Sequence, residues 1–167
     1  MISKRVHVAG IGYLTLSATE LGLRQISFDS QQDGPSAPLD ASSGKAAGIL
    51  ATALAELNAY GAGRLREFTV PLDPTVLPAG IQTILAELRK VSYATTISYG
   101  ALASAAGRPG AARLAGNAMA RNSLPIIIPC HRVVAAGGIG GYTPGLNWKR
   151  RLWDIEGLAW PQGAPCQ

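Results

Sequence analysis

The sequence predicts an α+β fold in two lobes, a small N-terminal β-meander with one helix and a mostly helical C-terminal lobe with a helix-turn-helix. Three observations support this prediction. Short alternating segments come first, helical periodicity dominates after residue 74, and 167 residues suffice for one domain or two small lobes. A hydrophobic fraction of 47% with 15% charged residues supplies enough apolar surface for a core and argues against disorder.

The first lobe is expected to open with a small antiparallel β-meander. Its three segments alternate apolar and polar residues and are separated by glycines; they span residues 6–8, 13–17 and 23–28. Residues 29–43 combine Gly, Pro, Asp and Ser, which indicates a surface loop. Apolar residues then recur at helical spacing from Ile49 until Gly61, so a helix is expected to complete this lobe.

Prolines mark the expected boundary between the lobes. Residues 68–72 favour one further extended piece, and Pro74 and Pro78 then stiffen the chain before a helix can begin. We therefore place the first lobe at residues 1–74, the second at 75–157 and a flexible tail at 158–167.

Three helices are expected in the second lobe before its long loop. The first has four apolar residues on one face, Ile81, Ile84, Leu85 and Leu88, with the basic pair Arg89 and Lys90 in its last turn. Ser98 is a good N-cap for the second, at 99–106, which Gly107 ends, and the third runs from near Pro109 to about Arg121. The pattern over residues 98–121 predicts a helix-turn-helix, winged or plain; two helices with no DNA-binding role fit it equally well.

The third of these helices carries a basic face. Arg113, Asn117 and Arg121 stand four residues apart and project together, with the small residues Ala112 and Gly116 beside them. An ordinary solvated helix face more often includes glutamate, and no acidic residue lies on this side. DNA contact is therefore favoured over a merely wet surface.

Charge is unevenly distributed along the chain. Residues 78–167 carry nine Lys and Arg against three Asp and Glu, whereas residues 1–77 carry six against seven, for a net charge of +5. A basic second lobe suits a polyanion such as DNA, and a solvated basic surface fits the charge as well. No run approaches the roughly 18 apolar residues that cross a bilayer, and the N-terminus lacks a secretory pattern. We expect a cytoplasmic protein without membrane contact.

Only four residues are cysteine or histidine: Cys130, Cys166, His7 and His131. Their spacing matches no metal site, and Cys166 lies in the expected tail, so we predict reduced thiols and no metal. Cys130 follows an apolar, proline-bounded run and precedes His131 and Arg132, whose positive charge would favour the thiolate. Neighbours on a strand point apart, so thiol and imidazole meet only if the chain turns here. A small buried cysteine without chemistry fits the spacing equally well.

A longer pattern distinguishes these alternatives. Pro129-Cys130-His131-Arg132-Val133, with Asn122 before it and Gly140-Gly141-Tyr142 and Glu156-Gly157 after it, closely resembles the active-site signature of the O6-alkylguanine-DNA alkyltransferases. The resemblance is dense over residues 98–157. The first lobe matches only in its β-then-α layout, and for it the resemblance implies a supporting ribonuclease-H-like lobe.

The resemblance implies a role for each matched residue. Cys130 would accept the alkyl group as a thioether, His131 would take the thiol proton through a water, and Glu156 would fix the tautomer of His131. Asn122 would brace the turn before the active-site loop at 125–146. Tyr99 would rotate the 3′ phosphate and donate a proton to the leaving guanine.

Further residues are expected to contact DNA or the base. Arg113 would enter the stack that the flipped base leaves, and the other expected DNA contacts are Ala112, Gly116, Asn117, Arg121, Ser98 and Arg132. The expected pocket residues are Tyr142, Thr143, Val133, Pro125 and Pro144, beside a glycine-rich lip that starts at Gly137. Tyr142 either stacks on the base or packs as a structural tyrosine.

The implied activity is single-turnover repair of duplex DNA that carries O6-alkylguanine, and also O4-alkylthymine, without a cofactor. We expect a monomer, with cooperative assembly on DNA as the alternative, in the cytoplasm or on a prokaryotic nucleoid. A recognition module without transfer and a thiol hydrolase are competing hypotheses; the presence of Cys130 counts against the first and the basic helix-turn-helix against the second. Two departures from the family pattern stand out. Residues 91–94 lack its usual proline and glycine, and Pro144 occupies the lip.

Overall fold

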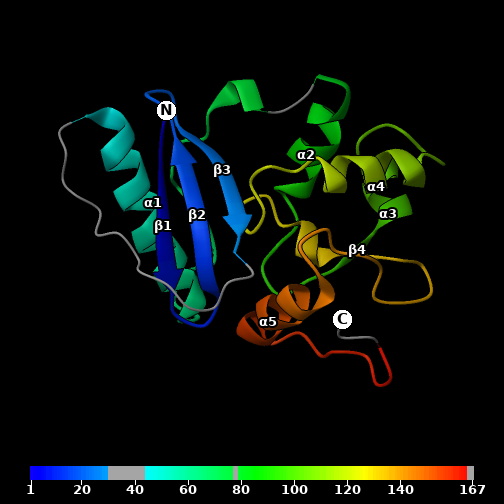
Figure 1. The fold of residues 1–167 in the computed structure, drawn as a ribbon. Helices are drawn as coiled ribbons and strands as arrows, with labels where there is room; N and C mark the ends of the chain where they lie inside the picture. Colours follow the sequence, from blue (N-terminus) through cyan, green and yellow to red (C-terminus); the bar gives the residue numbers. More distant parts are fainter. Residues whose placement is uncertain (30–43, 77–78, 165–167) are drawn as a thin grey trace. The chain divides into compact units, whose positions relative to one another are not determined.

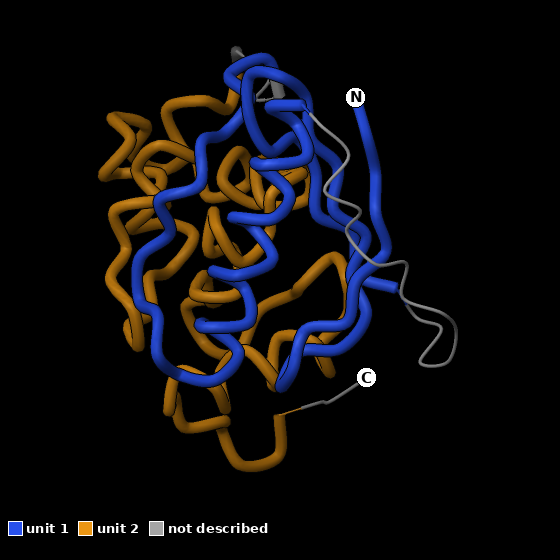
Figure 2. Tube along the Cα trace, turned by 90° about the vertical axis from the view of Figure 1, so that its left-hand side faces the viewer, with its two compact units in different colours: residues 1–76 blue, residues 77–167 orange. Residues whose placement is uncertain are grey.

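The computed structural model describes residues 1–29, 44–76 and 79–164. The chain divides into two compact units, Met1–Val76 and Leu77–Gln167, which Figure 2 colours separately. Most of the loop expected at 29–43 lies outside the described residues, as does Cys166. No helix in the described ranges is both long and apolar enough to cross a membrane.

The first unit is an antiparallel three-stranded sheet with one helix against it (Figure 1). Its elements are β1 (Ile2–Val8), β2 (Gly12–Ala18), β3 (Leu23–Phe28) and α1 (Lys45–Gly61). Strand alternation places Val6 opposite Leu14, both buried, on the sheet face that α1 covers. The predicted meander is thereby confirmed. Strands β1 and β2 extend beyond the predicted segments, and β3 has the predicted bounds.

The end of the first unit is tied to its sheet without forming a strand. The extended piece predicted at 68–72 provides only a parallel bridge from Leu72 to Leu23, with the Leu23 N–H donating to the Pro71 carbonyl at 2.7 Å. Asp73 is buried and accepts hydrogen bonds from Thr19 and Thr75, which hold the pKa of its carboxyl well below the usual range. The 3-10 helix Pro74–Val76 follows at the boundary predicted near Pro74.

The second unit is mostly helical (Figure 1). Its elements are the 3-10 helix Ala79–Ile81, α2 (Gln82–Leu88), β4 (Ile97–Ser98), α3 (Tyr99–Ala105), α4 (Ala112–Ala120), the 3-10 helix Cys130–Arg132, β5 (Val133–Val134) and α5 (Leu146–Glu156). Helices α2, α3 and α4 pack on one another, and β4 pairs in parallel with β5. The predicted α+β fold class with a mostly helical second part is confirmed.

Local signals explain the ends of these helices. The Ser98 hydroxyl accepts the Ala101 N–H at 3.1 Å and caps α3 as predicted, and Gly107 adopts a φ of +72° after its end. Helix α4 begins at Ala112, three residues later than Pro109 suggested, because the chain first makes a turn there. Helix α2 ends at Leu88, so the basic pair expected in its last turn lies just beyond it, where Lys90 pairs with Glu87.

Candidate active site

The chain turns at Cys130, as a meeting of thiol and imidazole requires. Residues Cys130–Arg132 form a single 3-10 turn after Pro129, and the Arg132 N–H donates to the Pro129 carbonyl at 2.9 Å. Cys130 is 5% exposed and His131 fully buried. Upstream, Ile126 has a φ of +76°, which a β-branched residue adopts only where its surroundings impose it.

Asn122 holds the loop that leads to this turn. Its amide nitrogen donates to the Ile128 carbonyl at 2.8 Å and to the Cys130 Sγ at 3.2 Å, and its amide oxygen accepts the Leu124 N–H at 3.0 Å. One side chain therefore satisfies main-chain groups on both sides of the strained Ile126. It also places a hydrogen-bond donor on the sulfur.

Cys130 lines a pocket of about 320 Å³ between helix α4 and the glycine-rich lip. The pocket is lined by Tyr99, Gly116, Met119, Ala120, Cys130, Gly141, Tyr142 and Thr143. The structure therefore brings together the predicted residues Tyr99, Gly116, Tyr142 and Thr143 around the thiol. The volume of this pocket lies at the lower end of the range for small-molecule sites.

The other predicted pocket residues lie outside this lining. Val133 is fully buried in β5, Pro125 is buried and bridges to Ile128, and Pro144 is half-buried. Sequence patterns identify the segment that forms a pocket more readily than the side chains that face it. Two further lining residues, Met119 and Ala120, were not predicted. They line the pocket because the C-terminal end of α4 borders it.

Tyr99 is seated against the lip by close backbone contact. The Gly141 N–H bonds to its hydroxyl, and Gly140 has a φ of +71° at a point where an added Cβ would lie 3.2 Å from the Tyr99 ring. Burial raises the pKa of the Tyr99 phenol above its ordinary value. The phenol therefore keeps its proton at neutral pH.

The Cys130 thiol is protonated at neutral pH. Burial raises its pKa to about 11, although hydrogen bonds from Asn122 and Tyr142 and the charge of Lys149 act in the opposite direction. These three groups therefore stabilise a thiolate whose formation still requires a base.

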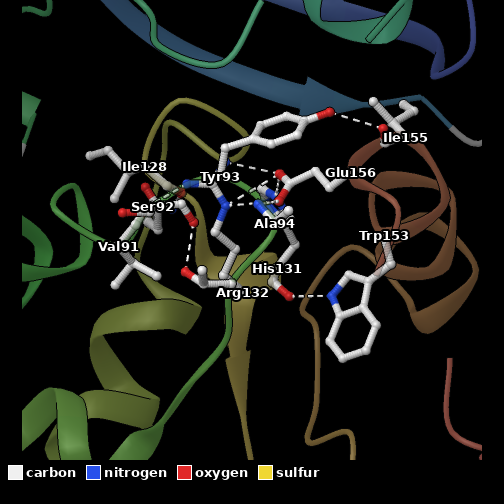
Figure 3. A network of polar contacts seen from close by, with 12 residues as sticks. Val91, Ser92, Tyr93, Ala94, Ile128, His131, Arg132, Trp153, Ile155 and Glu156 are labelled. Atoms are coloured by element: carbon white, nitrogen blue, oxygen red, sulfur yellow. Dashed lines mark hydrogen bonds and ion pairs between the residues drawn. The ribbon is translucent and has the colours of Figure 1, made fainter. Parts of the chain in front are cut away.

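His131 lies next to the thiol in the chain and is paired with a carboxylate. Its Nε2 is 2.6 Å from Glu156 Oε1, on the last residue of α5, and both side chains are fully buried (Figure 3). With Nε2–H donating to the carboxylate, the basic lone pair lies on Nδ1. Burial lowers the pKa of the imidazole, while Glu156 acts to raise it, so His131 is neutral and able to accept a proton.

Arg132 requires a correction. It was expected to contact DNA, but its side chain is only 6% exposed and its guanidinium binds Glu156, with Nε 3.1 Å from Oε2 and one terminal nitrogen 2.9 Å from Oε1. The other terminal nitrogen donates to the Val91 carbonyl at 2.6 Å. Because its donors are engaged inside the protein, Arg132 belongs to the network around His131 and not to the DNA-facing surface.

Two residues of α5 were not anticipated. Lys149 is fully buried and donates to the carbonyls of Val133 at 2.7 Å and Ile139 at 2.6 Å, and burial lowers its pKa to about 8. Trp153 donates its indole N–H to the His131 carbonyl at 2.8 Å. No sequence signal distinguished this lysine from the exposed Arg150 and Arg151 beside it.

The predicted basic face of α4 is exposed. Arg113, Asn117 and Arg121 are all exposed, as is Ala112, whereas the opposite side buries Ala115, Ala118 and Met119 in the core. Gly116 is half-exposed and lines the pocket, so the basic face and the entrance to Cys130 share one helix. Ser98 is engaged as the cap of α3.

The expected flexible tail begins with an ordered contact. Trp160 packs edge-to-face on Trp153 with ring centroids 5.4 Å apart, and the Leu158 N–H donates to the Trp153 carbonyl at 2.9 Å.

Within the ranges that the structure describes, no three His, Cys, Asp or Glu side chains gather as metal ligands would.

Family models match both units of the chain. The model of the 6-O-methylguanine DNA methyltransferase DNA-binding domain matches residues 81–158, and the model of the ribonuclease-like domain of the same enzymes matches residues 9–74. The chain belongs to the 6-O-methylguanine DNA methyltransferase family. This confirms the resemblance inferred from the residues around Cys130.

Individual members of the family show how far the similarity extends. The methylated-DNA–protein-cysteine methyltransferase of Mycobacterium leprae is 44% identical over 110 residues. These residues make up 65% of this chain and 66% of the relative, which is just under two thirds of its length. The enzyme of the same name from Mycolicibacterium paratuberculosis is 36% identical over 158 residues, 93% of each protein. A crystal structure of Mycobacterium tuberculosis OGT in complex with DNA has a TM-score of 0.75 at 35% identity, covering 93% of this chain and 92% of that one.

Proposed function

We propose that this protein repairs DNA by transferring the alkyl group of O6-alkylguanine in a duplex to Cys130, once and irreversibly. The observation that carries the proposal is the pocket in which Cys130 meets Tyr99 beside the exposed basic face of α4. Relatives named for methyl transfer from DNA to a protein cysteine, and a neighbour crystallised with DNA, support it.

The nucleophile is formed by a proton transfer within the buried network. The thiol gives its proton to the neutral His131, directly or through a water, and Glu156 stabilises the imidazolium that forms. The Asn122 amide, which donates a hydrogen bond to the sulfur, and the Lys149 ammonium both stabilise the negative charge of the thiolate that forms. Generating it on demand keeps the resting thiol unreactive.

The transfer itself is a displacement at carbon. The sulfur of Cys130 forms a bond to the alkyl carbon while the bond between that carbon and O6 breaks, and the electron pair stays on the oxygen. Tyr99, protonated and in the same pocket, donates its proton to the guanine as charge develops. The products are guanine and a thioether, which has no route back to the thiol.

Access to the carbon requires the base to leave the helix. A pocket of about 320 Å³ holds a single base, so the nucleotide must rotate out of the stack, at a cost of a few kcal/mol that an inserted side chain offsets. Arg113 is exposed at the start of α4 and suits that insertion. The same pocket would also accept O4-alkylthymine, whose oxygen presents an alkyl carbon in a similar position.

The proposal is tested by following the lesion. A duplex with one O6-methylguanine is incubated with an excess of protein, and the DNA is then hydrolysed to quantify guanine and O6-methylguanine. Wild-type protein should convert the lesion to guanine, whereas Cys130→Ala should bind the duplex and leave the lesion intact. A wild-type protein that binds the lesion without converting it would make the chain a recognition module and overturn the proposal.

A further inference from the structure

The Glu156 carboxylate is held by donors from two segments, the 3-10 turn at Cys130 and residues 91–94 (Figure 3). His131 and Arg132 of the 3-10 turn bind it, with His131 Nε2 at 2.6 Å and Arg132 Nε at 3.1 Å, and the Ala94 N–H donates to Oε2 at 2.9 Å. Arg132 also reaches the Val91 carbonyl at 2.6 Å. The relay carboxylate is therefore shared between a histidine and an arginine that are adjacent in sequence.

Glu156 and Arg132 have opposite effects on the protonation of His131. A buried carboxylate in contact with an imidazole favours the imidazolium, since the two charges then compensate each other. Arg132 already supplies that compensating charge, and it opposes a second positive charge on the neighbouring ring. The other charged group that acts on His131 is Lys149, which acts in the same direction as Arg132, while the neighbouring Cys130 is protonated at neutral pH.

We propose that Arg132 is a positioning residue that neutralises Glu156 and so keeps His131 in the uncharged form that can accept the thiol proton. The inference rests on the proposed function, because it concerns the base of that reaction. The burial of Arg132 and its three hydrogen bonds to Glu156 support the inference by geometry. The directions of the pKa effects on His131 agree, because Glu156 raises the pKa of its imidazole and Arg132 lowers it.

Residues 91–94 complete this arrangement with main-chain atoms. The Val91 carbonyl fixes the guanidinium and the Ala94 N–H fixes the carboxylate, while the Tyr93 hydroxyl donates to the Ile155 carbonyl at 2.9 Å. The Tyr93 ring lies 5.8 Å from the guanidinium carbon. The proline and glycine missing from this segment are therefore not needed for the contacts that hold Arg132 and Glu156.

The test uses the protonation of His131 directly. The chain has only two histidines, so NMR of protein labelled with ¹⁵N-histidine shows the ring signals of two residues. His7 in the first unit serves as an internal reference. In the free wild-type protein His131 should become protonated only at a pH below the ordinary pKa of a histidine. In Arg132→Met it should become protonated at clearly higher pH, whereas Arg132→Lys, which keeps the charge, should retain most of the wild-type behaviour. An exposed arginine on α5, changed as Arg151→Met, is the matched control and should not alter the titration.

Transfer kinetics provide the second readout. The acid limb of the rate against pH should move to higher pH in Arg132→Met, with a loss of about tenfold or more at pH 7 that recovers in alkaline buffer, since a general base contributes roughly 10²–10⁴-fold. A purely structural role would lower the rate equally at every pH. An unshifted His131 titration in a folded Arg132→Met protein would overturn the inference while leaving transfer to Cys130 intact.

A second variant covers the case in which Arg132→Met does not fold. Arg132→Gln removes the positive charge, while its amide can still donate a hydrogen bond to the buried Glu156 carboxylate. This variant should again raise the pH at which His131 is protonated. A wild-type titration of His131 in folded Arg132→Gln protein would overturn the inference.

Discussion

Replacing Asn122 by alanine should destabilise the second unit and make the Cys130 thiol less reactive. The substitution removes three hydrogen bonds. The Leu124 N–H loses its side-chain acceptor in a fully buried segment, which costs about 1–3 kcal/mol. The Ile128 carbonyl still accepts the Cys130 N–H, so its loss is nearer to about 1 kcal/mol. Together these give about 2–4 kcal/mol.

Urea unfolding followed by tryptophan fluorescence measures this loss. All three tryptophans belong to the second unit, so the signal reports on the part that contains Asn122. With a slope of about 2 kcal/mol per molar urea, in the middle of the usual range, the midpoint should fall by about 1–2 M. The matched control is Asn117→Ala, an exposed position in α4, which should change stability by less than about 0.5 kcal/mol.

The thiol gives a second readout of the same substitution. Asn122 lowers the pKa of Cys130, so its removal should raise that pKa further and slow iodoacetamide labelling at pH 8–9. Labelling must be compared under conditions where both proteins are folded. Equal midpoints for Asn122→Ala and Asn117→Ala, or faster labelling of the folded Asn122→Ala protein, would refute the bracing role inferred from the hydrogen bonds.

Three other substitutions test separate parts of the site. Arg113→Ala should slow transfer from duplex DNA far more than transfer from the free base O6-methylguanine, and equal losses would reject insertion into the stack. Ala94→Gly should raise the unfolding free energy by up to about 1 kcal/mol, because relief of a left-handed φ of +58° outweighs the added flexibility of glycine; a measured loss would contradict this. Cys130→Ala should remove a pH dependence of stability. The buried thiol ionises near pH 11 and the unfolded one near pH 9, so wild-type stability falls over that interval, by about 2 kcal/mol at pH 10.5 relative to the variant. Burial lowers the pKa of Lys149, so its titration raises stability with increasing pH in both proteins. The effect of the thiol is therefore read from the difference in stability between wild type and Cys130→Ala.

Local patterns predicted much of the fold and of the helix surface. Alternation in the first 28 residues identified the meander, and the hydroxyl of Ser98 followed by a helical pattern identified the start of α3. The spacing of Arg113 and Arg121 identified the exposed face of α4. These features depend on neighbouring residues, which a sequence shows directly.

The buried charges could not be predicted in the same way. Lysine and arginine are mostly exposed in proteins, so Arg132 was expected to contact DNA and Lys149 was given no role. Their burial depends on acceptors far away in the chain: Glu156 is 24 residues from Arg132, and the Val91 carbonyl is 41 residues from it. Only the fold brings these groups together. The roles of His131 and Glu156 came instead from the family resemblance, and their contact at 2.6 Å supports that pairing.

The acceptor role of Cys130 is tested most directly by intact-protein mass spectrometry. The protein is mixed with an excess of duplex that carries one O6-methylguanine, and its mass and peptides are then analysed. Transfer to Cys130 predicts a mass increase of one methyl group in place of one hydrogen, located on the peptide that contains Cys130, with no second addition as the lesion remains in excess. Repair without a change in protein mass, or a methyl group on any other residue, would contradict the central claim.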